Sequence, residues 1–143
     1  MRRFDNRTVD IMTVAHKLVG FAWVVSTTLV IGMAVLGTNS GDLDWERMAR
    51  YDRVGSLASV ATLGFGFAYI LFTRWSVKNP WVLGKWALYL VAVAVSGYGI
   101  PAVRAQDATR VIVLSAIELV ALLALMGMGV YLERARHAGR MTT

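Results

Sequence analysis

The first long apolar run of the chain, from Val14 to Gly37, constrains the fold more than any other feature. As a helix of about 24 residues, it is long enough to cross the ~30 Å hydrocarbon core of a bilayer. It is interrupted only by the His16–Lys17 pair and by three hydroxyl residues near its middle. A run of this length predicts a membrane-spanning helix rather than a core helix of a soluble domain.

Three further apolar runs follow along the chain. Of the 143 residues, 57% are hydrophobic and 17% are charged. A soluble domain can reach that balance, but not in four runs of roughly 20 residues each. We therefore predict an all-α fold, an integral membrane four-helix bundle with four transmembrane helices in one domain, 1–143. The predicted spans are 12–36, 51–72, 80–100 and 110–131.

The residue content excludes several chemistries. The chain has no cysteine and two histidines, of which only His16 lies in a predicted span. Disulfides, cysteine nucleophiles and the ordinary zinc sites are therefore excluded, and no metal site is predicted. No nucleophile–base pair or phosphate-binding loop stands out, so an enzyme is the less favoured class. The net charge is +6, but the basic residues lie where they orient a membrane protein, so no nucleic-acid partner is expected.

Cap and turn residues set the expected helix ends. Asn79 and Pro80 form a helix start, with Asn as N-cap and Pro at the first helical position. Pro101 is expected to end or kink the third helix, and Asp107 to cap the fourth. The charged segment 42–50 suits either a short helix at the membrane interface or a solvated loop.

The distribution of Lys and Arg predicts the orientation. The two terminal segments and the connection between spans two and three carry eight of these residues, and the other two connections carry five. The five-residue group also holds most of the acids of the chain, including Asp52. Cytoplasmic segments carry the excess of Lys and Arg in membrane proteins. Both termini are therefore predicted to be cytoplasmic.

Each predicted span carries one stripe of small and polar residues at steps of four and three. Such steps keep residues on one helix face, and small or hydroxyl residues favour close helix contacts in membranes. The stripes are therefore expected to face the inside of the bundle. Their members are His16, Gly20, Trp23 and Thr27; Gly55, Ser59, Thr62, Gly66 and Tyr69; Lys85, Tyr89, Ala92, Ser96 and Gly99; and Ser115, Glu118, Ala121 and Met128.

Glu118 is the one acid deep in a predicted span. A bare carboxylate there would cost roughly 2.5–3.5 kcal/mol on insertion scales, so Glu118 is expected to face inward and to be hydrogen-bonded. Two interpretations stay open, a proton or cation site and a satisfied polar core residue. Lys17 and Lys85 lie about five residues from the cytoplasmic ends of their spans, where snorkelling toward the headgroups is one interpretation. A direct Lys85–Glu118 pair is not expected, because their depths differ.

His16 lies at the depth of Lys85, and Gly20 one turn later leaves room for a flat ring. The segments AHKLVGFAWVV (15–25) and NPWVLGKWALYLV (79–91) resemble those of small bacterial membrane proteins of the copper-resistance protein D and membrane protoporphyrinogen oxidase types. The resemblance is strongest to their uncharacterised relatives. It implies that His16 and Lys85 are haem- or metal-associated positions, and Gly20 joins them as a candidate cofactor-binding residue because of the room it leaves. The expected location is the cell inner membrane. The Arg/Asn/Glu/Pro stretch of the oxidases is missing from 102–110, and this chain has fewer His and Met residues than the copper-resistance proteins.

Three functions follow as hypotheses. The first is a small non-enzymatic membrane protein, an accessory or structural subunit that packs with itself or within a larger membrane complex. The second is a haem-binding membrane redox protein that uses His16, with Lys85 near a propionate. The third is proton or cation passage at Glu118. In each of them the lipid bilayer is the common partner.

Overall fold

The computed structural model describes residues 6–73 and 80–137, and within these ranges the chain forms α-helices without any strand. The helices are α1 (Asn6–Ser40), α2 (Trp45–Thr73), α3 (Pro80–Arg104) and α4 (Ala108–His137). The prediction of an all-α chain with four long helices is therefore confirmed for the described residues.

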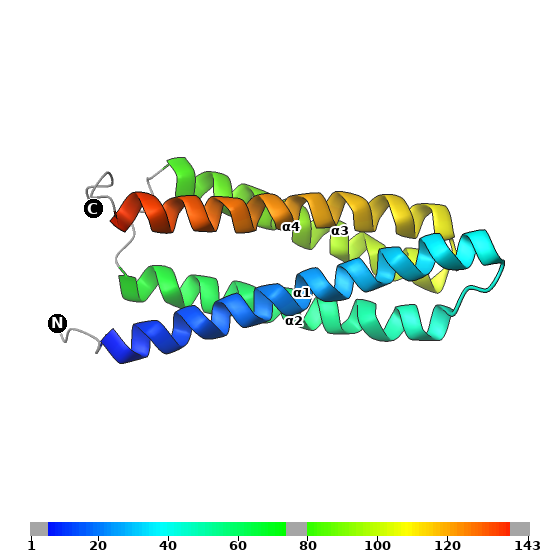
Figure 1. Ribbon diagram of the computed structural model, residues 1–143, viewed down its shortest axis with the longest axis horizontal. Helices are drawn as coiled ribbons and strands as arrows, with labels where there is room; N and C mark the ends of the chain where they lie inside the picture. Colours follow the sequence, from blue (N-terminus) through cyan, green and yellow to red (C-terminus); the bar gives the residue numbers. More distant parts are fainter. Residues whose placement is uncertain (1–5, 74–79, 138–143) are drawn as a thin grey trace.

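The helices form two antiparallel hairpins that lie side by side (Figure 1). Helix α1 packs against α2 and α4, and α3 packs against α4 and α2. Short connections, 41–44 and 105–107, close both hairpins at one end of the molecule, which we call the loop end. The start of α1 and the end of α4 lie at the opposite end, which we call the terminal end (Figure 1). The two hairpins diverge toward the terminal end.

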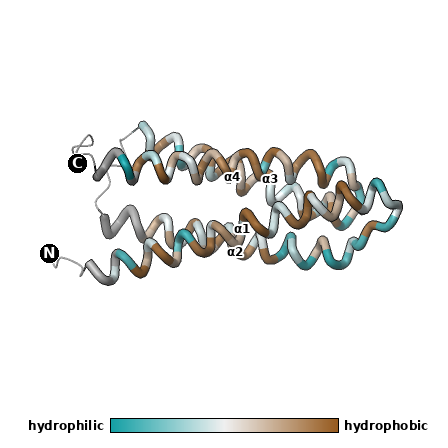
Figure 2. The backbone as a smooth tube through the Cα atoms, in the orientation of Figure 1, coloured by the Kyte–Doolittle hydropathy of each residue, from teal (hydrophilic) through white to brown (hydrophobic). Residues whose placement is uncertain are grey.

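Apolar residues occur along all four helices (Figure 2), and many of them are exposed. Leu18, Leu57, Leu90 and Val120, one from each helix, are 62–72% exposed. A soluble protein rarely exposes so much contiguous apolar surface, whereas a lipid-facing bundle requires it. Three helical segments are long and apolar enough to cross a membrane, namely Asp10–Ser40, Pro80–Arg104 and Ala108–Leu132.

Helix α2 is not among these three segments, so the structure supports three candidate spans where the sequence predicts four. The first turns of α2 carry charged residues from Glu46 to Arg53, which lower its mean hydropathy. The apolar residues 69–72 of the predicted second span lie outside the part of the chain whose side chains the structure describes. That α2 is a fourth membrane span therefore stays a proposal.

The expected helix ends are partly corrected. The start after Asp107 is confirmed, and the Asp107 carboxylate accepts a hydrogen bond of 3.0 Å from the backbone N–H of Arg110. Pro80 is helical, whereas the predicted N-cap, Asn79, lies outside the described residues. Pro101, however, does not end α3, which continues to Arg104. The segment 45–50 is neither a separate interfacial helix nor a loop, because it forms the first turns of α2. The Asp44 carboxylate caps this helix by accepting from the backbone N–H of Arg47 at 2.9 Å.

The four stripes face inward, as predicted. Their described members are buried or half-buried on all four helices. The interior they form is stacked in layers along the bundle. An apolar cluster lies near the loop end and a second one nearer the middle, with polar residues between them. The first cluster comprises Val30, Ala34, Met48, Ala102, Val103 and Val111, and the second Trp23, Ala58, Tyr89, Ala92, Ala121, Leu122 and Leu125.

Candidate functional site

Glu118 lies between the two apolar clusters and is 7% exposed. Its Oε1 atom accepts a hydrogen bond of 2.7 Å from the indole Nε1–H of Trp23 on α1. The side chain of Ser96 on α3 is a second hydrogen-bond partner. The expectation that Glu118 faces inward and is hydrogen-bonded is therefore confirmed, and this carboxyl group ties three helices together.

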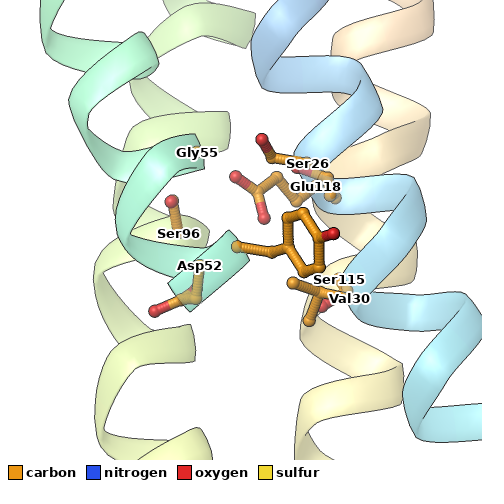
Figure 3. Close-up of a pocket in the computed structure, with 9 residues that line it drawn as sticks. Ser26, Val30, Asp52, Gly55, Ser96, Ser115 and Glu118 are labelled. Carbon is orange, nitrogen blue, oxygen red and sulfur yellow. The ribbon is translucent and has the colours of Figure 1, made fainter. Parts of the chain in front are cut away.

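A small cavity lies beside Glu118 in the centre of the bundle, and Figure 3 shows the carboxyl group pointing into the space between the helices. The centre of a water molecule has about 10 Å³ available there, which is about what one buried water needs. We call this level of the bundle the acidic layer. Its lining comes from all four helices: Ser26, Thr27, Val30, Tyr51, Asp52, Gly55, Ser96, Ser115 and Glu118.

Asp52 on α2 supplies the second carboxyl group of the acidic layer. It is half-buried, and its Oδ1 lies 3.7 Å from the position that a Cβ would take at Gly99 on α3. Its carboxyl group turns away from Glu118 toward α3 (Figure 3). From the sequence, Asp52 counts only among the charges of a connection, and its place in this site was missed. The signal was present, because Asp52 lies three residues before Gly55 and extends the inward stripe of α2 by one step.

The acidic layer has no basic side chain among the described residues that line it. Nearby, on the exposed face of α2, ion pairs join Arg47 to Asp44 and Arg50 to Glu46, and neither pair involves the cavity. The partners of Glu118 are an indole N–H and a hydroxyl group, which donate hydrogen bonds but carry no charge. A negative charge on either carboxyl group would therefore have no cation from the described lining to balance it.

His16 lies on the terminal side of the second apolar cluster and packs against α2. Its Cε1 atom is 3.5 Å from the position that a Cβ would take at Gly66. The backbone of Thr62 is a hydrogen-bond partner of the ring, while Nδ1 is buried without a hydrogen-bond partner in the described structure. The sequence pointed to Gly20 as the residue that makes room for a ring. Gly20 does have open space beside it, but the glycine in contact with the imidazole is Gly66.

Lys85 reaches into the same level of the bundle from α3. Its Nζ atom is 3.6 Å from the position that a Cβ would take at Gly129 on α4, and its charge acts on His16. Lys17 is exposed, whereas Lys85 is half-buried. Lys85 precedes Ser96, a hydrogen-bond partner of Glu118, by 11 positions on α3, which is roughly 16 Å along a helix, so Lys85 and Glu118 lie at different levels of the bundle. We call His16, Lys85 and the two glycines, Gly66 and Gly129, the basic layer.

Aromatic rings separate the two polar layers. The ring centroids of Trp23 and Tyr89 are 5.8 Å apart, and those of Tyr89 and Trp86 are 5.9 Å apart, both in edge-to-face geometry. The Tyr89 hydroxyl donates to the backbone carbonyl of Ser59 at 2.5 Å, which fixes the ring between α2 and α3. Alanine and leucine side chains fill the remaining space of this cluster. Neither polar layer is therefore continuous with the other in this conformation.

The fold and these layers define a class: a helical bundle with an apolar exterior, three membrane-capable helices and two interior polar sites. No family model, curated protein or solved structure matches this chain. Within the described residues, no three His, Asp or Glu side chains converge as a metal site would require. The function is therefore inferred from the layers themselves.

Proposed function

We propose that this protein is a four-span inner-membrane bundle that binds, and passes, a proton or a small cation at Glu118. The observation that carries the proposal is the acidic layer, in which Glu118 and Asp52 line one interior cavity without a basic side chain among the described lining residues. Passage at Glu118 was one of three hypotheses from the sequence, and the second carboxyl group now favours it over the other two.

Charge balance is the first physical argument. The effective penalty for taking an ion out of water is several kcal/mol in proteins, and intramembrane carboxylates normally pair with a cation or face a water-filled cavity. Trp23 and Ser96 contribute hydrogen bonds to Glu118 but no positive charge. Uptake of a proton or a cation would relieve this imbalance.

The size and chemistry of the cavity select the ligand class. Room for about one water molecule excludes organic substrates and leaves a proton, a water or one small ion. The lining atoms with ligand character are carboxyl, hydroxyl and phenol oxygens, which suit protons and hard cations. The lack of imidazole or sulfur ligands among the described lining residues disfavours a transition metal.

The apolar clusters on both sides supply the barrier that a passage mechanism requires. Met48 and Val111 are fully buried between the cavity and the loop end, and Trp23 is fully buried on the other side. In this conformation the site is therefore occluded along the bundle axis. In this proposal Asp52, which is half-buried and lines the same cavity as Glu118, relays protons between the bundle surface and the cavity.

The membrane assignment completes the proposal. The exposed apolar residues on all four helices support lipid contact, and α2 would serve as a fourth span because an interior helix end inside a bilayer would leave backbone groups unpaired. With four spans, the excess of Lys and Arg places both termini in the cytoplasm. The accessory-subunit or homo-oligomer hypothesis is the alternative class, and the next experiment separates the two.

The test is flux through purified protein in proteoliposomes, measured with pH-sensitive and Na⁺-sensitive dyes under an imposed membrane potential. We expect wild-type flux above that of empty vesicles, loss of flux in Glu118→Gln and a reduction in Asp52→Asn. Asp44→Asn is the matched control, because Asp44 is an exposed acid outside the cavity. Wild-type vesicles without flux, or equal flux in Glu118→Gln, would leave Glu118 as a structural residue and favour the subunit hypothesis.

Haem binding at His16 stays a prediction of the sequence resemblance. The described structure offers one unpartnered ring nitrogen there, with the ring packed against Gly66. A Soret band in protein produced with adequate haem, lost in His16→Ala, is the measurement that would support it.

A further inference from the structure

Three hydroxyl side chains of the acidic layer take no part in its hydrogen bonds. Ser26 and Thr27 on α1 and Ser115 on α4 line the cavity and are 4%, 5% and 8% exposed. None of the three makes a hydrogen bond to the described residues, whereas the neighbouring Thr28 donates to the backbone carbonyl of Val24 at 2.8 Å. Buried hydroxyl groups in helical bundles normally bond to the preceding turn or to another helix. Three that do neither at one cavity indicate a ligand that uses their oxygens.

The carboxyl groups of the layer determine the charge of that ligand. Glu118 points into the space between the helices, while Asp52 turns away from it toward α3 (Figure 3). An ionised carboxylate accepts at about four sites, so the bonds from Trp23 and Ser96 leave Glu118 with free lone pairs. One carboxylate that faces the cavity balances one positive charge, which favours a monovalent cation.

Divalent cations fit this layer less well. Mg²⁺ usually keeps several of its waters, and a cavity with room for about one water cannot hold them. Ca²⁺ is usually held by several carboxylates, and among the described residues no three acids or histidines converge.

Protonation of Glu118 alone would leave the hydroxyl groups unsatisfied. A proton on the carboxyl group removes its charge but provides nothing for the oxygens of Ser26, Thr27 and Ser115. A dehydrated cation satisfies both requirements, because the carboxylate balances its charge and the hydroxyl oxygens, each with two lone pairs, replace its water. Oxygen atoms are the ligands that hard cations prefer.

The charge of the carboxylate also favours the smaller of the common monovalent cations. The attraction between two charges rises as they approach each other, so a carboxylate gains more from the short contact with Na⁺ than from the longer contact with K⁺. The ligands of K⁺-selective filters are carbonyl dipoles, which have no full charge. A site built around one carboxylate and a few hydroxyl groups therefore selects Na⁺.

We propose that the acidic layer binds a dehydrated Na⁺ ion, with Glu118 as the charged ligand and the hydroxyl groups of Ser26, Thr27 and Ser115 as neutral ligands. The inference rests on the proposed function, because it names the ion that Glu118 binds. Helix α1 belongs to one hairpin and α4 to the other, so the ion links the two hairpins.

Thermal unfolding of the purified protein in detergent at pH 8 tests binding independently of flux. NaCl or KCl replaces choline chloride at constant ionic strength, and the rise in melting temperature gives an apparent Kd, because a ligand that binds only the folded state stabilises it. We expect Na⁺ to bind at least roughly tenfold more tightly than K⁺. No rise with NaCl, or an equal rise with KCl, would overturn the assignment.

Two variants on different helices test the neutral ligands. Thr27→Val and Ser115→Ala each remove one hydroxyl group and are expected to raise the apparent Kd for Na⁺ by roughly tenfold. Their melting temperatures in choline chloride should stay close to that of the wild type, because no hydrogen bond within the protein is lost. Thr28→Val is the matched control, since Thr28 is exposed and adjacent to Thr27. An unchanged Kd in folded Thr27→Val or Ser115→Ala protein would refute the hydroxyl ligands.

The flux assay separates this inference from the proposed function. Proton flux that is lost in Glu118→Gln, in a protein whose melting does not respond to Na⁺, would support passage at Glu118 and overturn the Na⁺ site. Melting that responds to Na⁺ in the wild type but not in Glu118→Gln, without flux of either ion, would support the Na⁺ site and refute passage.

Discussion

The acidic and basic layers are built in the same way, but the ionisable side chains of one are acidic and those of the other are basic. In each, residues from all four helices meet at one level, glycine provides space and an ionisable group points inward. Glu118 has its hydrogen-bond partners supplied by the protein, whereas Nδ1 of His16 is buried without one in the described structure. The acidic layer lies between two apolar clusters, and the basic layer has such a cluster on one side only. The comparison shows a carboxyl group whose hydrogen bonds are satisfied inside the bundle at one level, and a ring nitrogen whose hydrogen bond is not satisfied at the other.

Removing the side chain that separates the layers should have the largest effect. Trp23 is 1% exposed and belongs to both the apolar cluster and the Glu118 hydrogen bond. Trp23→Ala is expected to lower the free energy of unfolding by about 3–5 kcal/mol, because it creates a cavity and orphans the carboxyl group. Trp23→Phe, which loses mainly the hydrogen bond, should cost less. Thermal unfolding in detergent gives both values, and equal small losses would mean that Trp23 does not hold the layers apart.

Overpacking the basic layer should have the second-largest effect on the free energy of unfolding. Gly66→Leu would drive a side chain into the His16 ring, 3.5 Å from the first added carbon, and is expected to cost about 1–3 kcal/mol. Gly64→Leu on the same helix is the control, since nothing lies within 4 Å of its added Cβ. If both variants melt at the same temperature, Gly66 does not face His16 and the inward stripe of α2 is wrong.

The acidic layer should tolerate a change that keeps its shape. Glu118→Gln retains an acceptor for Trp23 and is expected to change the free energy of unfolding by less than about 1 kcal/mol. Glu118→Leu leaves two buried donors without a partner and should cost about 1–3 kcal/mol. The difference between the two melting temperatures measures how much of the role of Glu118 is hydrogen bonding. A Gln variant as unstable as the Leu variant would show that the charge itself holds the fold.

Placing the layers in the membrane requires a change with almost no effect on stability. The chain has no cysteine, so Ser40→Cys and Gln106→Cys at the loop end introduce single labelling sites. Both are exposed and are expected to react with a membrane-impermeant maleimide from the outside of intact cells. Reaction of either site only after lysis would reverse the orientation and put the acidic layer nearer the cytoplasm.

The sequence predicted the inward faces well, because small and polar residues at steps of four and three are rare outside helix contacts in an apolar chain. It predicted Glu118 for the same reason. It missed Asp52, because the charged start of α2 resembles a connection when only hydropathy is considered. Of the two outcomes predicted for Pro101, an end or a kink, the end is wrong, because a proline can lie inside a helix whose neighbours support it, as in membrane bundles.

Other features depend on three-dimensional neighbours and could not be read from spacing. The contact of His16 with Gly66, rather than with the space beside Gly20, is set by how α1 and α2 cross. The inward course of Lys85 depends on Gly129, which is far along the chain on another helix. A long flexible side chain near a helix end can extend toward the headgroups or turn into the bundle. The packing of the neighbouring helix decides which of these two directions it takes.

The hydrogen bond from Trp23 to Glu118 gives the protein an optical reporter at its own interior site. Indole fluorescence responds to the charge and polarity next to the ring nitrogen, and here that neighbour is the carboxyl group itself, 2.7 Å away. Of the five tryptophans in the chain, a variant that keeps only Trp23, with phenylalanine at the other four positions, would isolate this signal. Titration of that emission with acid or with cations would then record occupancy of the acidic layer directly, without any added label.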